Sequence, residues 1–333
     1  MVDSSEAEHV DHVIAALGAA CTRAPDQKSA DWSLLIEPGV PTVPEQRQWP
    51  RLELRPGGPA LTVTGNQDGV LRALGYYRPQ AAPVGIEVDW RLRRTRLVLS
   101  SAYLDQTHWS AWLAKVFFAS RLLAAGWRML HASAVVADGA AVVFVAAPGG
   151  GKSTLAHRAC RERGAAFLAD DLVLLGPDGT VVGWPTRVCL PCGLEGAASV
   201  EVGRMQTDLH GRRRLVVSLA EHRALGIVHA PPAPLGAVVH VRPGAALTAR
   251  PWSEESRAAA EAQACDIPVQ RLYTSDLVGL MGGPATFAPD DQGGVFAGAV
   301  GVELTLPDAA WLATAPVWET LANALPQVRG ALS

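Results

Sequence analysis

The residues best suited to chemistry stand together between Pro148 and Thr154, in the run Pro-Gly-Gly-Gly-Lys-Ser-Thr. Three consecutive glycines let a backbone fold closely around an anion, because no Cβ atom obstructs the N–H groups. The Lys152 ammonium can then pair with the β- and γ-phosphates of a nucleotide, and the Ser153 hydroxyl can hold Mg²⁺. The run therefore predicts a binding site for ATP and Mg²⁺, made by Pro148, Gly149, Gly150, Gly151, Lys152, Ser153 and Thr154.

The segments on either side of this run have the periodicity that a phosphate-binding loop needs. Residues 141–146 form an apolar run that predicts a buried strand, and residues 155–163 have the pattern of an amphipathic helix. The usual pattern has a glycine where this chain has Ala146. A left-handed backbone there would cost alanine on the order of 1 kcal/mol, unless the three glycines downstream take the bend instead.

Two carboxylates, Asp170 and Asp171, follow an apolar segment at residues 165–169 that is predicted to be a strand. If the sheet is doubly wound, both residues lie beside the loop, where ligands bind in open α/β folds. Neighbouring strand residues point to opposite faces, so we expect the two carboxylates to have different roles. One can approach the metal while the other approaches the acceptor of a phosphoryl group.

His131 begins a predicted strand, residues 130–137, which joins the strand before the loop through the hairpin signal Asp138-Gly139. A histidine at a sheet end is ordinarily a hydrogen-bonded polar group without a catalytic role. Its spacing from Lys152 and the Asp pair, however, resembles the catalytic domain of the HPr kinase/phosphorylase family, and more closely the smaller kinases related to it. The family core reads H-x-S, an apolar hairpin, G-x-x-G-x-G-K-S-T-L, a helix and G-x-x-x-x-[SA]-D-D, and it matches residues 129–190 here.

This resemblance implies an ATP- and Mg²⁺-dependent kinase with a fold similar to phosphoenolpyruvate carboxykinase. It implies that Asp170 is the general base toward an acceptor hydroxyl and that His131 tunes this base. It also implies that Lys152 acts on the nucleotide and that Ser153 and Asp171 lie on the metal side. The expected acceptor is a serine of a peptide or protein, or a small metabolite that carries a hydroxyl group.

The order of predicted elements indicates an α/β protein in two parts. Residues 1–106 predict a small β-rich α+β domain, because short apolar strands alternate there with proline and glycine clusters. Residues 107–333 would form a P-loop kinase domain of the HPr kinase or phosphoenolpyruvate carboxykinase type. An amphipathic helix over residues 107–128 marks the boundary. Near the other end, residues 253–264 predict a helix with Ser253 as its N-cap.

Two further stretches are candidates for the handling of substrate. Residues 183–211 are rich in glycine and small residues and predict a loop that holds the acceptor. In Arg212-Arg213-Arg214, a positioned arginine could neutralise the transferred phosphate, although a solvated turn is the more common role of such a run.

Composition limits the partners and the compartment. A net charge of −3 over 333 residues gives no electrostatic reason to expect nucleic acid or an anionic membrane surface as a partner. The acidic N-terminus lacks the basic and apolar regions of a signal peptide, and no apolar run has the ~20 residues of a membrane span, so we expect a cytoplasmic protein. Five cysteines, an odd number, argue against a disulfide framework, and Cys189 and Cys192 are expected to be reduced structural residues.

Two functions other than a kinase remain open at this point. A regulatory or scaffold protein would bind the nucleotide without transferring phosphate, and Ala146 would then mark lost turnover. A simple P-loop hydrolase would need an acidic residue that activates water. Its usual signature, four apolar residues followed by Asp-Glu, is replaced here by Phe-Leu-Ala-Asp-Asp at residues 167–171.

Overall fold

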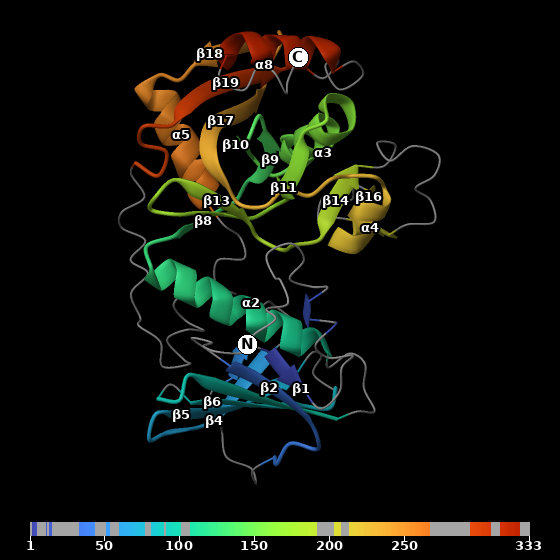
Figure 1. The fold of residues 1–333 in the computed structure, drawn as a ribbon, viewed down its shortest axis with the longest axis vertical. Helices are drawn as coiled ribbons and strands as arrows, with labels where there is room; N and C mark the ends of the chain where they lie inside the picture. The colour runs from blue at the N-terminus through green and yellow to red at the C-terminus, as the bar shows by residue number, and fades with distance from the viewer. Residues whose placement is uncertain are drawn as a thin grey trace. The chain divides into compact units, whose positions relative to one another are not determined.

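A computed structural model of the chain is mixed α/β (Figure 1). It describes residues 2–4, 11, 13–14, 33–43, 51–53, 60–76, 81–89, 91–100, 107–191, 203–207, 213–266, 294–307 and 314–326. Among these, the residues up to Ala125 form one unit and those from Gly126 onward form another.

The first unit is built on a seven-stranded sheet with the strand order β1-β2-β7-β6-β5-β4-β3. Its strands are β1 (Val2–Ser4), β2 (Ser33–Pro38), β3 (Arg51–Glu53), β4 (Ala60–Gln67), β5 (Val70–Tyr76), β6 (Val84–Asp89) and β7 (Arg94–Leu99). In β6 and β7 every second residue is buried, as in a sheet with one packed face. The sequence did not predict β1 or β5, whereas it did predict strands at the other five positions.

Helix α2 (Thr107–Ala124) belongs to this first unit. Its Trp109 is 3% exposed and lies so close to Gly75 of β5 that a Cβ atom there would stand 3.0 Å from the indole ring. The sequence placed this helix at the start of the second part, after residue 106. Trp109 instead packs on the N-terminal sheet, and the division between the units follows the helix.

The second unit contains a nine-stranded sheet with the order β11-β9-β10-β17-β13-β12-β8, in which β19 pairs with β17 and β18 with β19. Its strands are β8 (Arg128–Leu130), β9 (Ser133–Ala137), β10 (Ala140–Ala146), β11 (Ala166–Ala169), β12 (Val173–Leu175), β13 (Thr180–Gly183), β17 (Ala233–Pro243), β18 (Thr248–Pro251) and β19 (Val300–Leu306). Strands β10, β17 and β19 are parallel, and β9 runs antiparallel to both β10 and β11. The carboxyl ends of β10, β11, β17 and β19 therefore share one edge with the start of β9, and we call it the carboxyl edge.

The hairpin that the sequence predicted between β9 and β10 is confirmed. Ala140 pairs with Ala137, and the two turn residues, Asp138 and Gly139, have φ angles of 49° and 79°. Two left-handed residues are what a tight two-residue hairpin requires. The turn fixes the register that brings Ser133 opposite Phe144, near the carboxyl edge.

Helices cover both faces of this sheet (Figure 1). On one face, α3 (Lys152–Arg163) and α8 (Ala315–Ala324) pack on β10, β17 and β19 through a core that includes Phe144 and Trp318. On the other face lies α5 (Glu254–Cys265), which packs through Ala264. Ser253 caps α5 as predicted, and Ser256 completes a reciprocal pair of hydrogen bonds. No helix in the described part of the chain is both long enough and apolar enough to cross a membrane.

A three-stranded sheet adjoins α3, with β16 (Arg213–Val217) between β14 (Val188–Pro191) and β15 (Arg204–Thr207). Helix α4 (Leu219–Ala224) follows it. The described parts of residues 183–211, which the sequence predicted to be an acceptor loop, thus include strands. The remaining parts of that stretch lie outside the described residues.

A chain of three histidines joins α3 to α4 and the loop that follows it. His157 Nδ1 lies 3.1 Å from His222 Nε2, and His222 Nδ1 lies 3.1 Å from His229 Nε2. A neutral ring in the middle of such a chain can donate from one nitrogen and accept at the other. Burial and the neighbouring His157 and His229 lower the pKa of His222 to about 3, and burial and Arg223 lower that of His229 to about 4.

Acid should therefore destabilise the second unit through His222, which is fully buried. The unfolded chain binds a proton at this residue below about pH 6.5, whereas the folded protein binds it only near pH 3, so the free energy of unfolding falls as the pH drops between these values. Between pH 7.5 and pH 5 the loss from His222 should be about 2 kcal/mol.

Denaturant titrations of the parent and of His222→Gln at both pH values test this expectation. The parent should lose about 2 kcal/mol more than the variant, which has no ring to protonate. Equal losses in the two proteins would contradict the assignment of a neutral His222.

Candidate functional site

The glycine loop, residues 147–151, connects the end of β10 to α3 at the carboxyl edge. Gly149 and Gly151 have φ angles of 82° and 95°, in the left-handed region that favours glycine. Gly151 is the N-cap of α3 and no side chain caps this helix, so the first N–H groups of α3 have no partner within the helix. The loop and the positive end of the helix dipole together form an arrangement suited to an anion.

Ala146 fits the loop without strain. It is the last residue of β10, it is fully buried, and its backbone is extended, so the left-handed conformation falls on the glycines downstream. The close approach occurs at Gly150, where a Cβ atom would lie 2.9 Å from the Ala146 Cβ and 3.0 Å from the Ala147 carbonyl oxygen. Glycine is thus required at position 150, while alanine is tolerated at position 146.

Lys152 is the first residue of α3 and is only 7% exposed. Burial lowers the pKa of its ammonium group, the charges of Asp171 and Asp170 oppose that change, and the charge of Arg214 adds to it. Two carboxylates and a second cation therefore lie within electrostatic reach of Lys152. Of the Arg212-Arg213-Arg214 run, Arg214 lies on β16 and so contributes to this site, while Arg212 lies outside the described residues.

The Asp170 carboxylate is buried, with 2% of the residue exposed, and it accepts hydrogen bonds from three separate elements. Ser133 Oγ of β9 donates to Oδ1 at 2.7 Å, and the backbone N–H of Cys189 in β14 donates to Oδ2 at 3.1 Å. Ser153 of α3 is the third donor. Burial raises the pKa of Asp170, the Ser153 bond counteracts it, and the nearby charge of Asp171 raises it further.

Asp171 differs from Asp170 in its backbone conformation, its exposure and the direction of its pKa shift. The N–H of Leu172 donates to the carbonyl of Asp170 at 2.8 Å, and Asp171 between them has a φ of 71°, so these residues form a γ-turn. A left-handed conformation is tolerated by aspartate and is typical of strained backbone at functional sites. The turn directs the Asp171 side chain, which is 54% exposed, away from the burial site of Asp170.

His131 pairs with Asp171. Its Nε2 lies 3.2 Å from Asp171 Oδ1, and its Nδ1 lies 3.2 Å from the carbonyl oxygen of Asp266, just after α5. Partial burial would by itself raise the pKa of Asp171, but the hydrogen bond and charge of His131 and the charge of Lys152 outweigh it and lower that pKa. Asp171 is therefore ionised at neutral pH. The resemblance implied that His131 acts on Asp170. In the structure His131 instead pairs with Asp171, because the γ-turn separates the two carboxylates.

The predicted site residues thus meet at the carboxyl edge. Residues 148–154 form the loop and the start of α3, His131 stands at the start of β9, and the Asp pair follows β11. Sequence reasoning missed two contributors, the hydroxyl of Ser133 and the backbone N–H of Cys189, and it named the Arg212-Arg213-Arg214 run only as a candidate. Ser133 is the serine of the H-x-S pattern, whereas no local signal announces a backbone donor from a strand that is distant in the sequence.

Oxygen donors suited to Mg²⁺ are present at this edge. Ser153 and Asp170 are hydrogen-bonded to each other, and hard oxygen ligands of this kind are the ones that Mg²⁺ prefers. The described residues contain no group of three or more His, Cys, Asp or Glu side chains that could hold a metal alone. This donor set fits an ion that is bound through one or two protein oxygens and completed by phosphates.

Comparisons with known proteins found weak structural similarity and no significant similarity in sequence. No protein-family model matches the chain, and no curated protein matches it significantly. A solved structure that does match is entitled "Structure of the Hpr(Ser) kinase/phosphatase from Coxiella burnetii", with 12% identity and a TM-score of 0.29. The match covers 61% of this chain and 93% of that chain. A TM-score this low does not establish a shared fold or function.

The contact between Ala146 and Gly150 predicts opposite effects of two similar substitutions. Gly150→Ala should force the loop to shift and weaken Mg·ATP binding at least tenfold, which corresponds to about 1.4 kcal/mol. Ala146→Gly should leave the affinity within a few-fold of the parent. Calorimetry on both variants and on the double variant tests this, and the double variant should regain part of the affinity because one of the two clashes is gone. A large gain from Ala146→Gly alone would mean that alanine cripples the loop.

Asp170→Asn should make the protein more stable. The pKa of Asp170 is raised in the folded state. The free energy of unfolding is therefore lowered by the ionised form at every pH above that raised value. An amide keeps the shape and removes the charge, so the melting temperature at pH 7.5 should rise, by about 2 to 4 °C for each kcal/mol.

Asp178→Asn is the matched control for this stability measurement, because it also removes one aspartate charge. The pKa of Asp178 is lowered by hydrogen bonds from Thr180, so its substitution should not stabilise the protein. A melting temperature that falls in Asp170→Asn would show that the buried hydrogen bonds outweigh the burial of the charge.

Proposed function

We propose that this protein is an ATP- and Mg²⁺-dependent kinase that transfers the γ-phosphoryl group to a hydroxyl of a peptide, a protein or a small metabolite. The observation that carries the proposal is the convergence of three groups at the carboxyl edge. These are the buried Lys152, the hydrogen-bonded Ser153 and Asp170, and the exposed Asp171 with its partner His131. Phosphoryl transfer consists chiefly of positioning and charge neutralisation, and this set supplies both.

The loop side would hold the triphosphate. The N–H groups of the glycine loop and of the first turn of α3 face the phosphates, and Lys152 pairs with the β- and γ-phosphates. Burial disfavours the charge of Lys152 in the free protein, and a triphosphate beside it would favour that charge again. Arg214 would supply a second positive charge, which stabilises the transferring group.

On the metal side, the Ser153 hydroxyl would hold the ion and Asp170 would support Ser153. Mg²⁺, when bound there, supplies neutralisation of the charge on the β- and γ-phosphate oxygens. Ser133 and the N–H of Cys189 hold the Asp170 carboxylate in place, so Asp170 in turn orients the Ser153 hydroxyl. With three donors on a carboxylate that is 2% exposed, Asp170 has little room for an acceptor hydroxyl as well.

Asp171 is the better candidate for the general base. It is ionised and half-exposed, and His131 fixes its direction. The acceptor oxygen would attack the γ-phosphorus, its proton would pass to Asp171, and the bond from the γ-phosphorus to the bridging oxygen would break to release ADP. This reverses the assignment that the resemblance implied, in which Asp170 was the base and Asp171 lay on the metal side. His131 is then a positioning residue for Asp171.

A Mg²⁺ titration of the initial phosphotransfer rate separates the two assignments, with labelled ATP and candidate peptides or cell-extract metabolites as acceptors. Asp171→Asn keeps the left-handed turn, since asparagine also tolerates it, and should lower the rate by about 10² to 10⁴ at every Mg²⁺ concentration. His131→Ala should cause a milder loss of the same kind. Asp170→Asn should instead be rescued in part by high Mg²⁺. If the two Asp variants behave in the opposite way, Asp170 is the base after all.

The same assay distinguishes a kinase from the other two functions. Inorganic phosphate released without any labelled acceptor would favour a hydrolase, in which Asp171 activates water. Binding of Mg·ATP without turnover would favour a regulatory protein. Lys152→Ala should weaken Mg·ATP binding by about 1 to 3 kcal/mol, the range for a charged hydrogen bond, and unchanged affinity would refute the phosphate site itself.

A further inference from the structure

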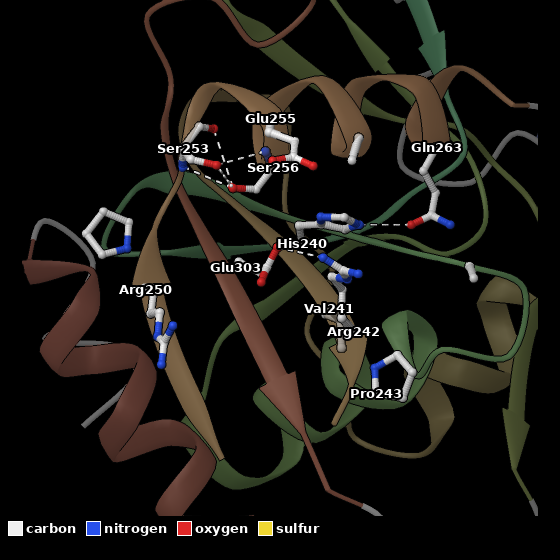
Figure 2. Close-up of a pocket in the computed structure, with 13 residues that line it drawn as sticks. His240, Val241, Arg242, Pro243, Arg250, Ser253, Glu255, Ser256, Gln263 and Glu303 are labelled. Carbon is white, nitrogen blue, oxygen red and sulfur yellow. Dashed lines mark hydrogen bonds and ion pairs between the residues drawn. The ribbon is translucent and has the colours of Figure 1, made fainter. Parts of the chain in front are cut away.

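A pocket of about 670 Å³ opens at the carboxyl edge beside the glycine loop. Its walls come from the ends of β17, from β18 and β19, and from one side of α5, and Ala147 of the glycine loop belongs to its lining. Figure 2 shows His240 and Gln263 at its inner side, with Arg242, Arg250 and Glu303 from the three strands. Its volume lies in the range of small-molecule sites.

The position of the pocket relative to the reacting groups is fixed by the sheet order. Strand β10, which leads into the glycine loop, lies between β9 and β17. His131 and the Asp pair emerge on the β9 side, and the pocket lies on the β17 side. A nucleotide whose γ-phosphate faces Asp171 would thus extend its other end across the loop toward Ala147 and the pocket.

The charges of the lining favour a ligand part without net charge. Two arginines, Arg242 and Arg250, are matched by two glutamates, Glu255 and Glu303. Arg242 Nη1 donates to Glu303 Oε2 at 3.2 Å, so part of the positive charge is already neutralised. A second phosphate site would need an excess of positive charge, which this lining does not have.

The polar groups of the lining suit a heterocyclic base with a ribose. His240 Nε2 lies 3.0 Å from Gln263 Oε1, and because an amide oxygen can only accept, Nε2 carries the proton. Nδ1 is then an acceptor that is buried without a partner among the described residues. The Gln263 amide nitrogen, on a side chain that is only partly buried and lines the pocket, can donate to the hydrogen-bonding edge of a base. Glu303 can accept from ribose hydroxyls, and the flat guanidinium of Arg242 can stack on a ring.

We infer that this pocket binds the nucleoside half of the nucleotide, the base and ribose, whose phosphates lie in the glycine loop. The inference rests on the proposed function, because it takes the phosphate site at Lys152 as given. The residues that would distinguish a nucleotide from a bare polyphosphate then come from β17, β19 and α5. These elements follow the predicted motifs in the sequence.

Filling the pocket tests the inference. Ala259 is exposed on α5 and lines the pocket, so Ala259→Trp places an indole in it without disturbing the core. Ala262 is also exposed on α5 but does not line the pocket, which makes Ala262→Trp the matched control. Calorimetry compares Mg·ATP with Mg·tripolyphosphate, which has the phosphates and no nucleoside, for the parent, both tryptophan variants and Gln263→Leu.

The parent should bind Mg·ATP at least tenfold more tightly than Mg·tripolyphosphate. Ala259→Trp should lose most of that difference and Gln263→Leu part of it, while their tripolyphosphate affinities stay within about twofold and Ala262→Trp changes neither. Parental ATP affinity in Ala259→Trp would overturn the inference and leave the phosphate site intact. A raised KM for the acceptor in that variant, with unchanged ATP affinity, would assign the pocket to the acceptor instead. If the parent binds neither ligand, the proposed function itself fails.

Discussion

The burial of the Asp170 carboxylate is the constraint on which the rest of the site depends. A charge in a poorly solvated position must be satisfied by donors, and those available come from β9, from β14 and from the first turn of α3. The carboxylate therefore joins the large sheet, the small sheet and the glycine loop at one point. The Asp170 carboxylate thus holds Ser153, and with it the start of α3, although burial of this charge lowers the free energy of unfolding.

The γ-turn at Asp171 resolves a problem that two adjacent carboxylates create. If both were buried together, their mutual repulsion would raise the pKa of each. The turn leaves the Asp170 carboxylate buried and the Asp171 carboxylate half-exposed. His131 and Lys152 favour the ionised form of Asp171. Left-handed backbone at a residue other than glycine is the local cost of this separation, and it occurs where the proposed chemistry needs two carboxylates in different states.

The local elements of the second unit could be predicted from the sequence, and the long-range contacts could not. The hairpin turn at Asp138-Gly139, the strand and loop before α3, and the Ser253 cap each have a signal within a few residues. Asp170 and Asp171 do face different ways, but the cause is the γ-turn after β11 and not alternation along a strand. The partner of His131 was missed because it depends on a turn after the strand, and the pocket was missed because its residues are spread from Ala147 to Glu303. Helix α2 was assigned to the wrong unit for a similar reason, since an apolar stripe does not say which sheet it will cover.

The anchor that Cys189 provides has a consequence for which substitutions this site can accept. The donor to Asp170 is the main-chain N–H, so the side chain at this position does not take part in the bond. Nearly any residue that suits an exposed strand position would preserve the interaction, and proline, which has no N–H group, is the one that removes it. This contact does not depend on which residue stands at position 189, provided that it is not proline. Related sequences could therefore vary at this position while the geometry of the site stays the same.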